Sequence, residues 1–459
     1  MPSDHTRRSF LRTTGLTATA FAVARPWLNA ATRAVSPNEK LNIAAIGVGG
    51  VGRSNVGNSA DENIVALCDL DLARCGGTIK QHPGAALFTD FRKMLDAHPD
   101  IDAVIIATPD HSHAYMAMEC MRRGKHVYVQ KPLTHSVFEA RILTESARKH
   151  KVATQMGNQG NSGEGIRLVA EIIAAGIIGK VREVHTWTNR PIWPQSVEMG
   201  RPSGSERIPE GMDWDQWCGP AQVRPYHSSY HPGKWRAWWD FGTGSLGDMG
   251  CHIIDPAFMA LNLRYPESVE GNISTVYETF GKKTTGKFEA YPRSSVVRFK
   301  FPARGEMPPV TLTWWDGGLM PPRPDELEDD MPFGDPNGGC LFIGDKAKLV
   351  CGCYGLNPRI LNPDLREVAK KLAKTIARVP GNSNGHEKAW IQACKGGPAA
   401  SSNFDYSGPF TEMVLMGNLA SRYPDRKLLW DGPKMQVTND KDANAYVHRE
   451  YRKGFELGA

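Results

Sequence analysis

The feature that most constrains this chain is a glycine-rich turn that follows a short apolar segment. Residues 41–46 read Leu-Asn-Ile-Ala-Ala-Ile, and a G-x-G-x-x-G pattern follows at Gly47, Gly49 and Gly52. In a strand–turn–helix unit, the first glycine permits a tight turn, the second lets the backbone approach a pyrophosphate, and the third lets helix and strand pack closely. The helix that follows points its N-terminal amides at the phosphates. The predicted dinucleotide contacts here are Gly47, Gly49, Gly50, Val51 and Gly52.

An acidic residue stands where such a unit would hold a ribose. The apolar segment 64–67 is followed by Asp69, at the spacing of about 20 residues that places a carboxylate on the ribose 2′-hydroxyl. The same carboxylate would repel a 2′-phosphate, so Asp69 favours NAD over NADP, although the nearby Arg74 weakens the distinction. The alternative interpretation is that Asp69 is a solvated turn residue.

Apolar strands and helices continue to alternate as far as residue 155. The predicted segments are a strand at 102–107, a helix at 113–123, a strand at 125–129, a helix at 136–150 and a strand at 151–155. This alternation predicts an α/β fold with a doubly wound parallel sheet, in which ligands bind beyond the carboxyl ends of the strands. The further predicted cofactor-binding residues at these ends are Thr108, Pro109, His113, Gln130, Lys131 and Asn158.

Beyond residue 156 the alternation stops and aromatic residues become dense. Seven of the twelve tryptophans fall between Trp187 and Trp239. One interpretation is packing within an irregular region. The other, which we favour, is a carbohydrate platform, because flat aromatic faces stack on sugar rings while polar neighbours bind hydroxyls. The predicted substrate-binding residues of this region are Arg190, Trp193, Trp235 and Arg236.

A glycine-rich stretch at 242–255 carries an acid–base pair. Asp248 and His252 are four residues apart, so they share one face of the predicted helix. A histidine with a pKa near neutrality suits proton transfer from a hydroxyl, and a nearby carboxylate can orient it. The alternative is an ordinary hydrogen-bonded pair on a helix face.

Taken in order, these motifs resemble the Gfo/Idh/MocA family, which includes glucose–fructose oxidoreductase and inositol dehydrogenase. The resemblance runs from about residue 40 to the helices near 386–422. It implies a second domain with an open, mostly antiparallel sheet that often mediates oligomerisation, so a homo-oligomer, a dimer or a tetramer, is expected. Carried over position by position, it implies that Lys131, Asp248 and His252 form the catalytic group, with Asp248 and His252 also in contact with substrate.

One position departs from the family's pattern. Its usual Glu-Lys-Pro corresponds to Gln130-Lys131-Pro132 in this chain. A glutamate would stabilise the charged form of Lys131 and a neutral glutamine would not, so Lys131 is expected to release its proton more readily. The alternative is that net hydride transfer is less optimised in this chain.

The first thirty-four residues resemble a twin-arginine export signal. Residues 6–12 read Thr-Arg-Arg-Ser-Phe-Leu-Arg and precede a weakly apolar stretch, which predicts export to the periplasm; the alternative is a basic tail. The predicted organisation is a signal at 1–34, a Rossmann domain at 41–155 and a substrate and oligomerisation domain at 156–459.

Composition narrows the partners that the chain is expected to have. The net charge of +6 is spread without a basic block, which gives no sign of nucleic-acid binding. The chain contains no run of 18 apolar residues, so a membrane span is not predicted. Its nine cysteines are scattered, which predicts neither a disulfide scaffold nor a metal site.

Together these patterns predict an exported enzyme that uses NAD on a hydroxyl of a sugar, polyol or glycoside. Because free NAD is scarce outside the cytoplasm, the cofactor is expected to stay tightly bound and to be reset on the enzyme. One route is oxidoreduction with a second substrate. Another is NAD-assisted glycoside cleavage, as a hydrolase or lyase, by transient oxidation and elimination with no net redox change. A noncatalytic sugar- or NAD-binding protein is the third alternative.

Overall fold

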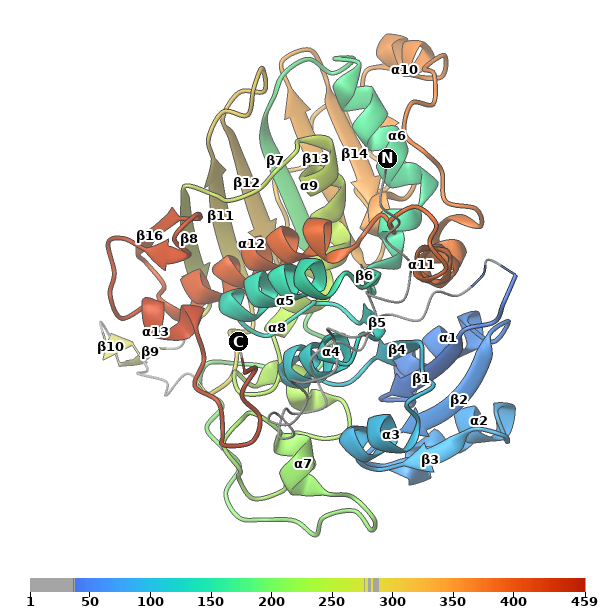
Figure 1. Ribbon diagram of the computed structural model, residues 1–459. Helices are drawn as coiled ribbons and strands as arrows, with labels where there is room; N and C mark the ends of the chain where they lie inside the picture. Colours follow the sequence, from blue (N-terminus) through green and yellow to red (C-terminus); the bar gives the residue numbers. More distant parts are fainter. Residues whose placement is uncertain (1–35, 37, 276, 280–281, 284–288, 459) are drawn as a thin grey trace, which may run out of the picture.

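The chain forms two large β-sheets with helices packed around and between them (Figure 1). The structure, a computed structural model, describes residues 36, 38–275, 277–279, 282–283 and 289–458. The predicted signal at 1–34 lies outside the described residues.

The first sheet is the predicted Rossmann sheet. Its six strands lie in the order β3-β2-β1-β4-β5-β6, and every neighbouring pair is parallel. The central β4 and β5 are buried at every position because helices cover both faces of a doubly wound sheet. The strands are β1 (Asn42–Ile46), β2 (Asn63–Cys68), β3 (Ala86–Phe88), β4 (Ala103–Ile106), β5 (His126–Val129) and β6 (Thr154–Met156).

Local sequence sets where the helices of this sheet begin. The Asp90 side chain accepts from the amides of Arg92 and Lys93, and Ser136 forms a reciprocal capping box with Glu139. The helices are α1 (Gly50–Asn58), α2 (Gly76–Gln81), α3 (Phe91–Ala97), α4 (His113–Arg122) and α5 (Val137–His150). The short 3₁₀ turns are η1 (Leu72–Cys75), η2 (Asp110–Ser112) and η3 (Gln159–Ser162).

A helix from the far end of the chain completes this sheet. Trp390 and Cys394 of α11 (His386–Cys394) are buried in one cluster with Leu41 and Ile43. The predicted boundary at 155 therefore does not contain the whole of the first domain's core, because the chain returns to it some 230 residues later to supply this apolar face.

The second sheet has nine strands in the order β15-β14-β13-β7-β12-β11-β8-β16-β17. Only the β7–β12 pair is parallel among them, so the sheet is mostly antiparallel, as the family resemblance implied. The strands are β7 (Val181–Thr188), β8 (Ser268–Ile273), β11 (Ser295–Phe301), β12 (Val310–Trp315), β13 (Gly338–Gly344), β14 (Lys348–Gly352), β15 (Arg359–Ile360), β16 (Lys427–Asp431) and β17 (Gln436–Val437). Apart from it, β9 (Tyr277–Thr279) pairs with β10 (Lys282–Lys283).

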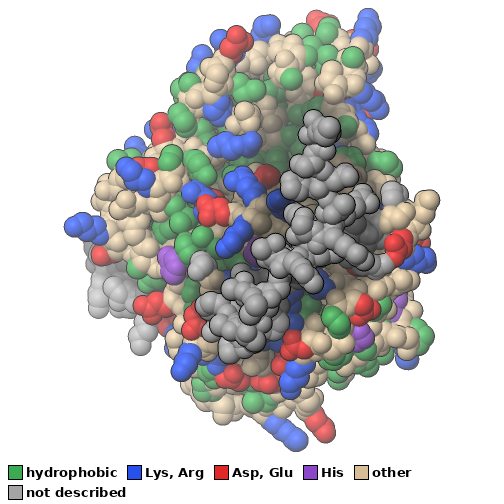
Figure 2. Space-filling model, viewed as in Figure 1, with side chains coloured by type: hydrophobic (Ala, Val, Ile, Leu, Met, Phe, Trp, Pro, Cys, Tyr) green, Lys and Arg blue, Asp and Glu red, His purple; other side chains and the backbone are tan. Residues whose placement is uncertain are grey.

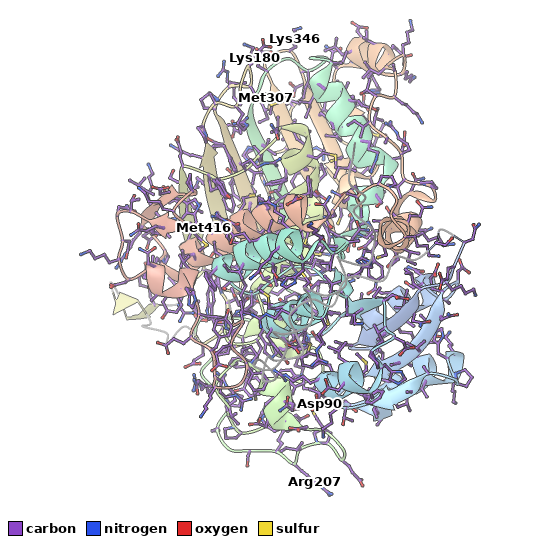
Figure 3. The ribbon with its side chains drawn as sticks, viewed as in Figure 1. Asp90, Lys180, Arg207, Met307, Lys346 and Met416 are labelled. Carbon is purple, nitrogen blue, oxygen red and sulfur yellow. The ribbon has the colours of Figure 1, made fainter. Side chains whose placement is uncertain are left out.

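The longest helix of the described residues joins the two halves. Helix α12 (Phe404–Arg422) packs on α5 and on β8 and β11, with Met416 fully buried (Figures 1 and 3). In the described residues no helix is long and apolar enough to cross a membrane. The other helices are α6 (Glu164–Ala174), α7 (Trp214–Cys218), α8 (Gly244–Ile253), α9 (Asp255–Ala260), α10 (Pro363–Ala369) and α13 (Asn444–Val447), with 3₁₀ turns η4 (Lys234–Ala237), η5 (Cys353–Gly355) and η6 (Asn382–Gly385).

A long connection between β7 and α8 extends away from the large sheet. We call its residues 205–241 the arm; it contains α7, and Arg207 lies at the end of the molecule opposite Lys180 and Lys346 (Figure 3). Arg452 of the C-terminal tail holds the arm, since its guanidinium donates to the Gly219 and Asp215 backbone oxygens and pairs with the Asp215 carboxylate. Figure 2 shows basic and acidic side chains interspersed over the face that it draws.

Candidate functional site

The glycine turn is packed too tightly for larger residues. Gly47 has φ +79°, and a Cβ there would lie 2.6 Å from the Ala107 backbone oxygen. A Cβ on Gly52 would lie 1.8 Å from the Gly47 oxygen. The space beside the start of α1 is open, because a Cβ on Gly50 would meet no atom within 4 Å. The turn therefore has room for a pyrophosphate laid against backbone amides.

Asp69 follows β2 and lies beside this turn. Its Oδ2 accepts from the Val48 amide at 2.9 Å, and its Oδ1 accepts from the Asp71 amide at 3.0 Å. The side chain is partly exposed. These bonds fix a carboxylate at the edge of the glycine turn, where it fits the hydroxyls of an adenosine ribose.

His113, predicted to contact the cofactor, has a different place in the structure. Its ring is fully buried, with Nδ1 2.8 Å from the Pro132 oxygen and Nε2 2.8 Å from the Thr108 oxygen. Burial lowers its pKa. His113 therefore ties the loop after β4 to the loop after β5, while Thr108 and Pro109 remain partly exposed at the edge of the sheet.

Lys131 meets Asp248 at the junction of the two domains. The Lys131 ammonium donates to the Asp248 backbone oxygen at 2.5 Å and to its Oδ1 at 3.1 Å. Two guanidinium groups approach the same carboxylate, with Arg236 Nε 3.1 Å from Oδ1 and Arg190 Nε 3.7 Å from Oδ2. Although burial opposes ionisation, the charges of Lys131 and Arg236 hold the pKa of Asp248 well below its usual range.

His252 lies one helical turn beyond Asp248 and is 3% exposed. Burial, reinforced by the positive charge of Lys131, lowers its pKa well below the usual value, so the ring is neutral at pH 7. Its Nδ1 has no hydrogen-bond partner among the described residues. The Tyr354 ring packs edge-on against the His252 ring, with 4.7 Å between the ring centroids. The expectation that Asp248 orients this ring is not met, because the carboxylate is directed to Lys131, Arg236 and Arg190.

Gln130 faces α1 and not the lysine ammonium. Its Nε2 donates to Asn55 Oδ1 at 3.0 Å, and its Oε1 accepts from the Lys131 backbone amide at 3.3 Å. The expectation that residue 130 sets the charge beside Lys131 is therefore corrected, since the carboxylate that meets the ammonium belongs to Asp248.

Asn158 also differs from its predicted role. The side chain is fully buried, donates to Asp255 Oδ2 at 2.8 Å, and accepts from the Ser402 hydroxyl at 2.5 Å. Asn161 and Tyr406 donate to the same carboxyl. Burial, opposed by these hydrogen bonds, raises the pKa of Asp255 to about 7. Asn158 thus fastens the loop after β6 to α9 instead of facing a cofactor.

The aromatic region is mainly an internal core. Most of its rings are buried in a cluster of the arm and its flanks, which corrects the platform interpretation in favour of packing. Trp235 is 7% exposed and packs under the Arg236 guanidinium, 4.2 Å from the ring centroid. Trp193, the other predicted substrate-binding tryptophan, has a partly exposed ring. The cluster contains Met212, Trp214, Trp217, Cys218, Ala221, Tyr226, Tyr230, Trp235, Ala237, Trp238, Phe241 and Ala290.

Sequence reasoning missed Asp110, which lies beside the cluster of charges. It is 4% exposed and accepts from the Thr243 hydroxyl. Burial, opposed by that bond and by the charges of Arg236 and Lys131, raises its pKa to about 7. Its position directly after Thr108-Pro109 was the available signal. Within the described ranges, no three His, Cys, Asp or Glu side chains are arranged to hold a metal ion.

Comparison with known sequences matches two family models to the chain. Residues 41–158 match the oxidoreductase family with an NAD-binding Rossmann fold, and residues 166–276 match the C-terminal alpha/beta domain of that family. Inositol 2-dehydrogenase of Rubrobacter xylanophilus is 30% identical over 31% of this chain and 42% of its own length. Glycosyl hydrolase family 109 protein 1 of Shewanella sp. strain ANA-3 is 28% identical over 44% of this chain and 50% of its own. The matches thus span about half the length of these curated relatives.

Solved structures share the fold over most of the chain. The WlbA dehydrogenase from Bordetella pertussis, solved with NADH and UDP-GlcNAcA, aligns with a TM-score of 0.58 at 17% identity and covers 86% of this chain and 99% of that one. An inositol dehydrogenase homolog from Azotobacter vinelandii, solved with NADH and myo-inositol, aligns with a TM-score of 0.54 at 14% identity, over 86% and 98% of the two chains. At these identities the likeness shows the fold alone.

Proposed function

We propose that this chain, which belongs to the Gfo/Idh/MocA family of NAD-binding oxidoreductases, oxidises a hydroxyl group of a sugar, polyol or glycoside. The observation that carries the proposal is the meeting of Lys131, Asp248 and neutral His252 at the carboxyl edge of a dinucleotide-binding sheet. A lysine paired with a carboxylate and a buried neutral histidine supply the charge stabilisation and proton acceptor that alcohol oxidation needs.

The residues that would hold NAD are the glycine turn, Asp69, Thr108 and Pro109. When bound, NAD supplies the hydride acceptor. Lys131 would donate a hydrogen bond to the substrate oxygen and stabilise negative charge that develops there. Asp248 positions the ammonium, and His252 would accept the hydroxyl proton, since its ring is neutral. Removal of either Lys131 or His252 is expected to stop turnover.

The position of the arm favours the proposal that NAD stays tightly bound. It meets the first domain at two loops on the edge of the sheet where NAD would lie. After β2, Leu70 packs on the aromatic cluster, and His231 of the arm lies 3.7 Å from Asp71. After β4, both ring nitrogens of His111 lie against the backbone oxygens of Trp217 and Phe241, at 2.8 and 3.1 Å. A segment that bridges these loops would hinder exit of the nucleotide.

NAD-assisted glycoside cleavage is the second candidate. Relatives that match 228 residues of this chain include proteins named as glycosyl hydrolase family 109 and alpha-N-acetylgalactosaminidase. In that route, transient oxidation of a ring hydroxyl would acidify the neighbouring C–H, and a base would remove that proton as the glycosidic substituent leaves. Water would then add to the double bond, and the carbonyl would be reduced back, so no net redox change would result. An enclosed cofactor suits this chemistry because no net NADH is released.

The deciding experiment separates the two candidates by product. The purified chain is incubated with NAD and with myo-inositol, N-acetylgalactosamine or the 4-nitrophenyl glycoside of N-acetylgalactosamine. A rise in NADH absorbance supports oxidoreduction, and release of nitrophenol without NADH supports cleavage. Saturable binding of sugar with neither product would overturn both and leave a noncatalytic binding protein.

Two further proposals come from the sequence. The arginine pair at positions 7 and 8 underlies proposed export by the twin-arginine route to the periplasm. Replacing both arginines by lysine is expected to keep the protein in the cytoplasmic fraction, and unchanged fractionation would contradict export. A homo-oligomer is proposed from the second domain's sheet, and light scattering at the mass of one chain would contradict it.

A further inference from the structure

A pocket of about 660 Å³ opens at one end of the large sheet. It lies where β7, β8 and β12 end and where β11 begins. We call it the Trp193 pocket. The lining residues used below are Asn189, Trp193, Gln195, Glu198, Ser274, Arg293 and Gly317.

The tryptophan in this pocket is fixed in place by the fold. Trp193 Nε1 donates to Gln195 Oε1 at 2.8 Å, and Gln195 Nε2 donates to the Pro292 backbone oxygen at 2.7 Å. Gln195 is 6% exposed, whereas the Trp193 ring is partly exposed. The ring is thus held in one orientation without a ligand, so little side-chain freedom would be lost when a ligand binds against it.

The pocket adjoins the charges around Asp248 on two sides. The Arg236 guanidinium lies 5.9 Å from the centroid of the Trp193 ring and 3.1 Å from the Asp248 carboxylate, so one side chain spans the gap between them. Arg190 approaches the same carboxylate, donates to Asn189 Oδ1, and accepts from the Gly317 amide through its backbone oxygen at 2.7 Å.

The chemistry of the lining suits a carbohydrate. The residues that line this space with the Trp193 ring include Asn189, Ser274 and Arg293, whose side chains carry an amide, a hydroxyl and a guanidinium. Aromatic faces pack on the C–H faces of sugar rings, and amide, hydroxyl and guanidinium groups bind sugar hydroxyls. The pocket is lined by one positive residue, Arg293, and one negative residue, Glu198. The charge of the lining therefore does not favour an anionic ligand.

We propose that the Trp193 pocket is a subsite for a second sugar ring, attached to the ring that reacts at Lys131 and His252. This inference rests on the proposed function and deepens it, because it makes a disaccharide or longer glycoside the substrate class. A free monosaccharide or inositol would fill only the space at Asp248. The attached ring would contact Trp193 and would reach Ser274 and Arg293, which line the same pocket.

The test measures binding separately from turnover. Calorimetric titration of the full chain loaded with NAD compares maltose, cellobiose, lactose and N,N′-diacetylchitobiose with glucose, galactose and N-acetylglucosamine. At least one disaccharide is expected to bind about tenfold more tightly than its single sugar. Trp193→Ala should abolish that difference and leave the affinity for the single sugar unchanged. The matched control is Ile192→Ala, since Ile192 is 73% exposed and is not among the pocket's lining residues.

Two further variants keep the outcome clear if Trp193→Ala folds poorly. Trp193→Phe retains an aromatic face and should keep most of the preference, whereas Arg293→Ala, which removes a guanidinium from the pocket lining, should reduce it. The inference is overturned if no disaccharide binds more tightly than its single sugar, or if Trp193→Ala weakens both ligands equally. Absence of turnover with every sugar would defeat the proposed function, while a disaccharide preference lost in Trp193→Ala would still establish the subsite.

Discussion

The Lys131 ammonium lies 2.5 Å from the backbone oxygen of Asp248 and 3.1 Å from its carboxylate. One partner follows the fifth strand of the Rossmann sheet, and the other is on α8 of the second domain. The contact therefore exists only when the two domains are packed together, so a change at their interface would alter the site without touching either residue.

Removal of the lysine charge should separate chemistry from cofactor binding. In Lys131→Met, turnover is expected to fall by about 100-fold or more, the range seen when a group that stabilises transition-state charge is lost. The NAD content of the purified protein should stay unchanged, because the glycine turn is intact. Lys125→Met, at the start of the same strand segment, is the control and should retain turnover. Full activity of Lys131→Met would remove this residue from the mechanism.

The pH dependence of activity should reflect a histidine that stays neutral. Burial and Lys131 lower the pKa of His252 well below 6.5, and only the neutral ring can accept a proton. As pH falls from 8 to 6.5, His252 therefore remains competent, and the acid limb of kcat/KM is expected below pH 6.5. Asp110, whose pKa is raised to about 7, is the other group near the site that titrates in this range. An inflection near pH 7 that persists in Asp110→Asn would contradict the prediction.

Two glycines of α1 provide a matched pair for the cofactor turn. In Gly52→Ala the new Cβ would lie 1.8 Å from the Gly47 oxygen, so the turn must distort and NAD affinity should fall at least tenfold. In Gly57→Ala the new Cβ meets nothing within 4 Å, and the change should stabilise the helix by about 0.5–1 kcal/mol. Titration with NAD and thermal unfolding check both. Equal NAD affinity in the two variants would show that the turn does not hold the cofactor.

Asp69 should determine the choice between the two nicotinamide cofactors. Asp69→Asn retains an oxygen for the Val48 amide but removes the charge that would repel a 2′-phosphate. The ratio of NADP to NAD affinity is expected to rise by about tenfold, as measured by fluorescence titration of both. Asp61→Asn removes a charge whose side chain is 81% exposed and should leave the ratio unaltered. An unchanged ratio in Asp69→Asn would refute the assignment.

The tail that holds the arm should slow the loss of NAD. Arg452 anchors Asp215 and Gly219, so Arg452→Ala is expected to increase the rate of NAD release several-fold and to lower the NAD retained through gel filtration. Arg148→Ala is the control, because its pairing with Asp405 is exposed on both sides and such pairs contribute little. Identical retention in both variants would exclude the arm from holding the cofactor.

The parts of the fold that could be predicted depend on local pattern. The continuous apolar run of β4, the glycine turn and Asp69 at the end of β2 each contain their signal within a few residues. Parallel strands bring such ends to one edge, so the location of the site followed from the alternation alone. The Asp248–His252 spacing placed both residues on α8 for the same reason.

What could not be predicted depends on contacts between distant segments. The sequence does not distinguish a buried histidine from one that faces a ligand. His113 links two loops because the backbone oxygens of Pro132 and Thr108 face its ring nitrogens. Asn158 forms hydrogen bonds with Asp255 and Ser402, which lie 97 and 244 residues further along the chain. The tryptophans were ambiguous because stacking on sugars and packing in a core favour the same residue type.

Because Trp390 and Cys394 close the apolar face of the first sheet, the nucleotide-binding half is a discontinuous unit. A ribosome must therefore synthesise almost the entire polypeptide before that half can bury its hydrophobic surface. A fragment ending near residue 155 would expose Leu41 and Ile43 to solvent and would be prone to aggregate. Any attempt to transplant this half into a chimera should carry a covalently fused copy of 386–400 with it.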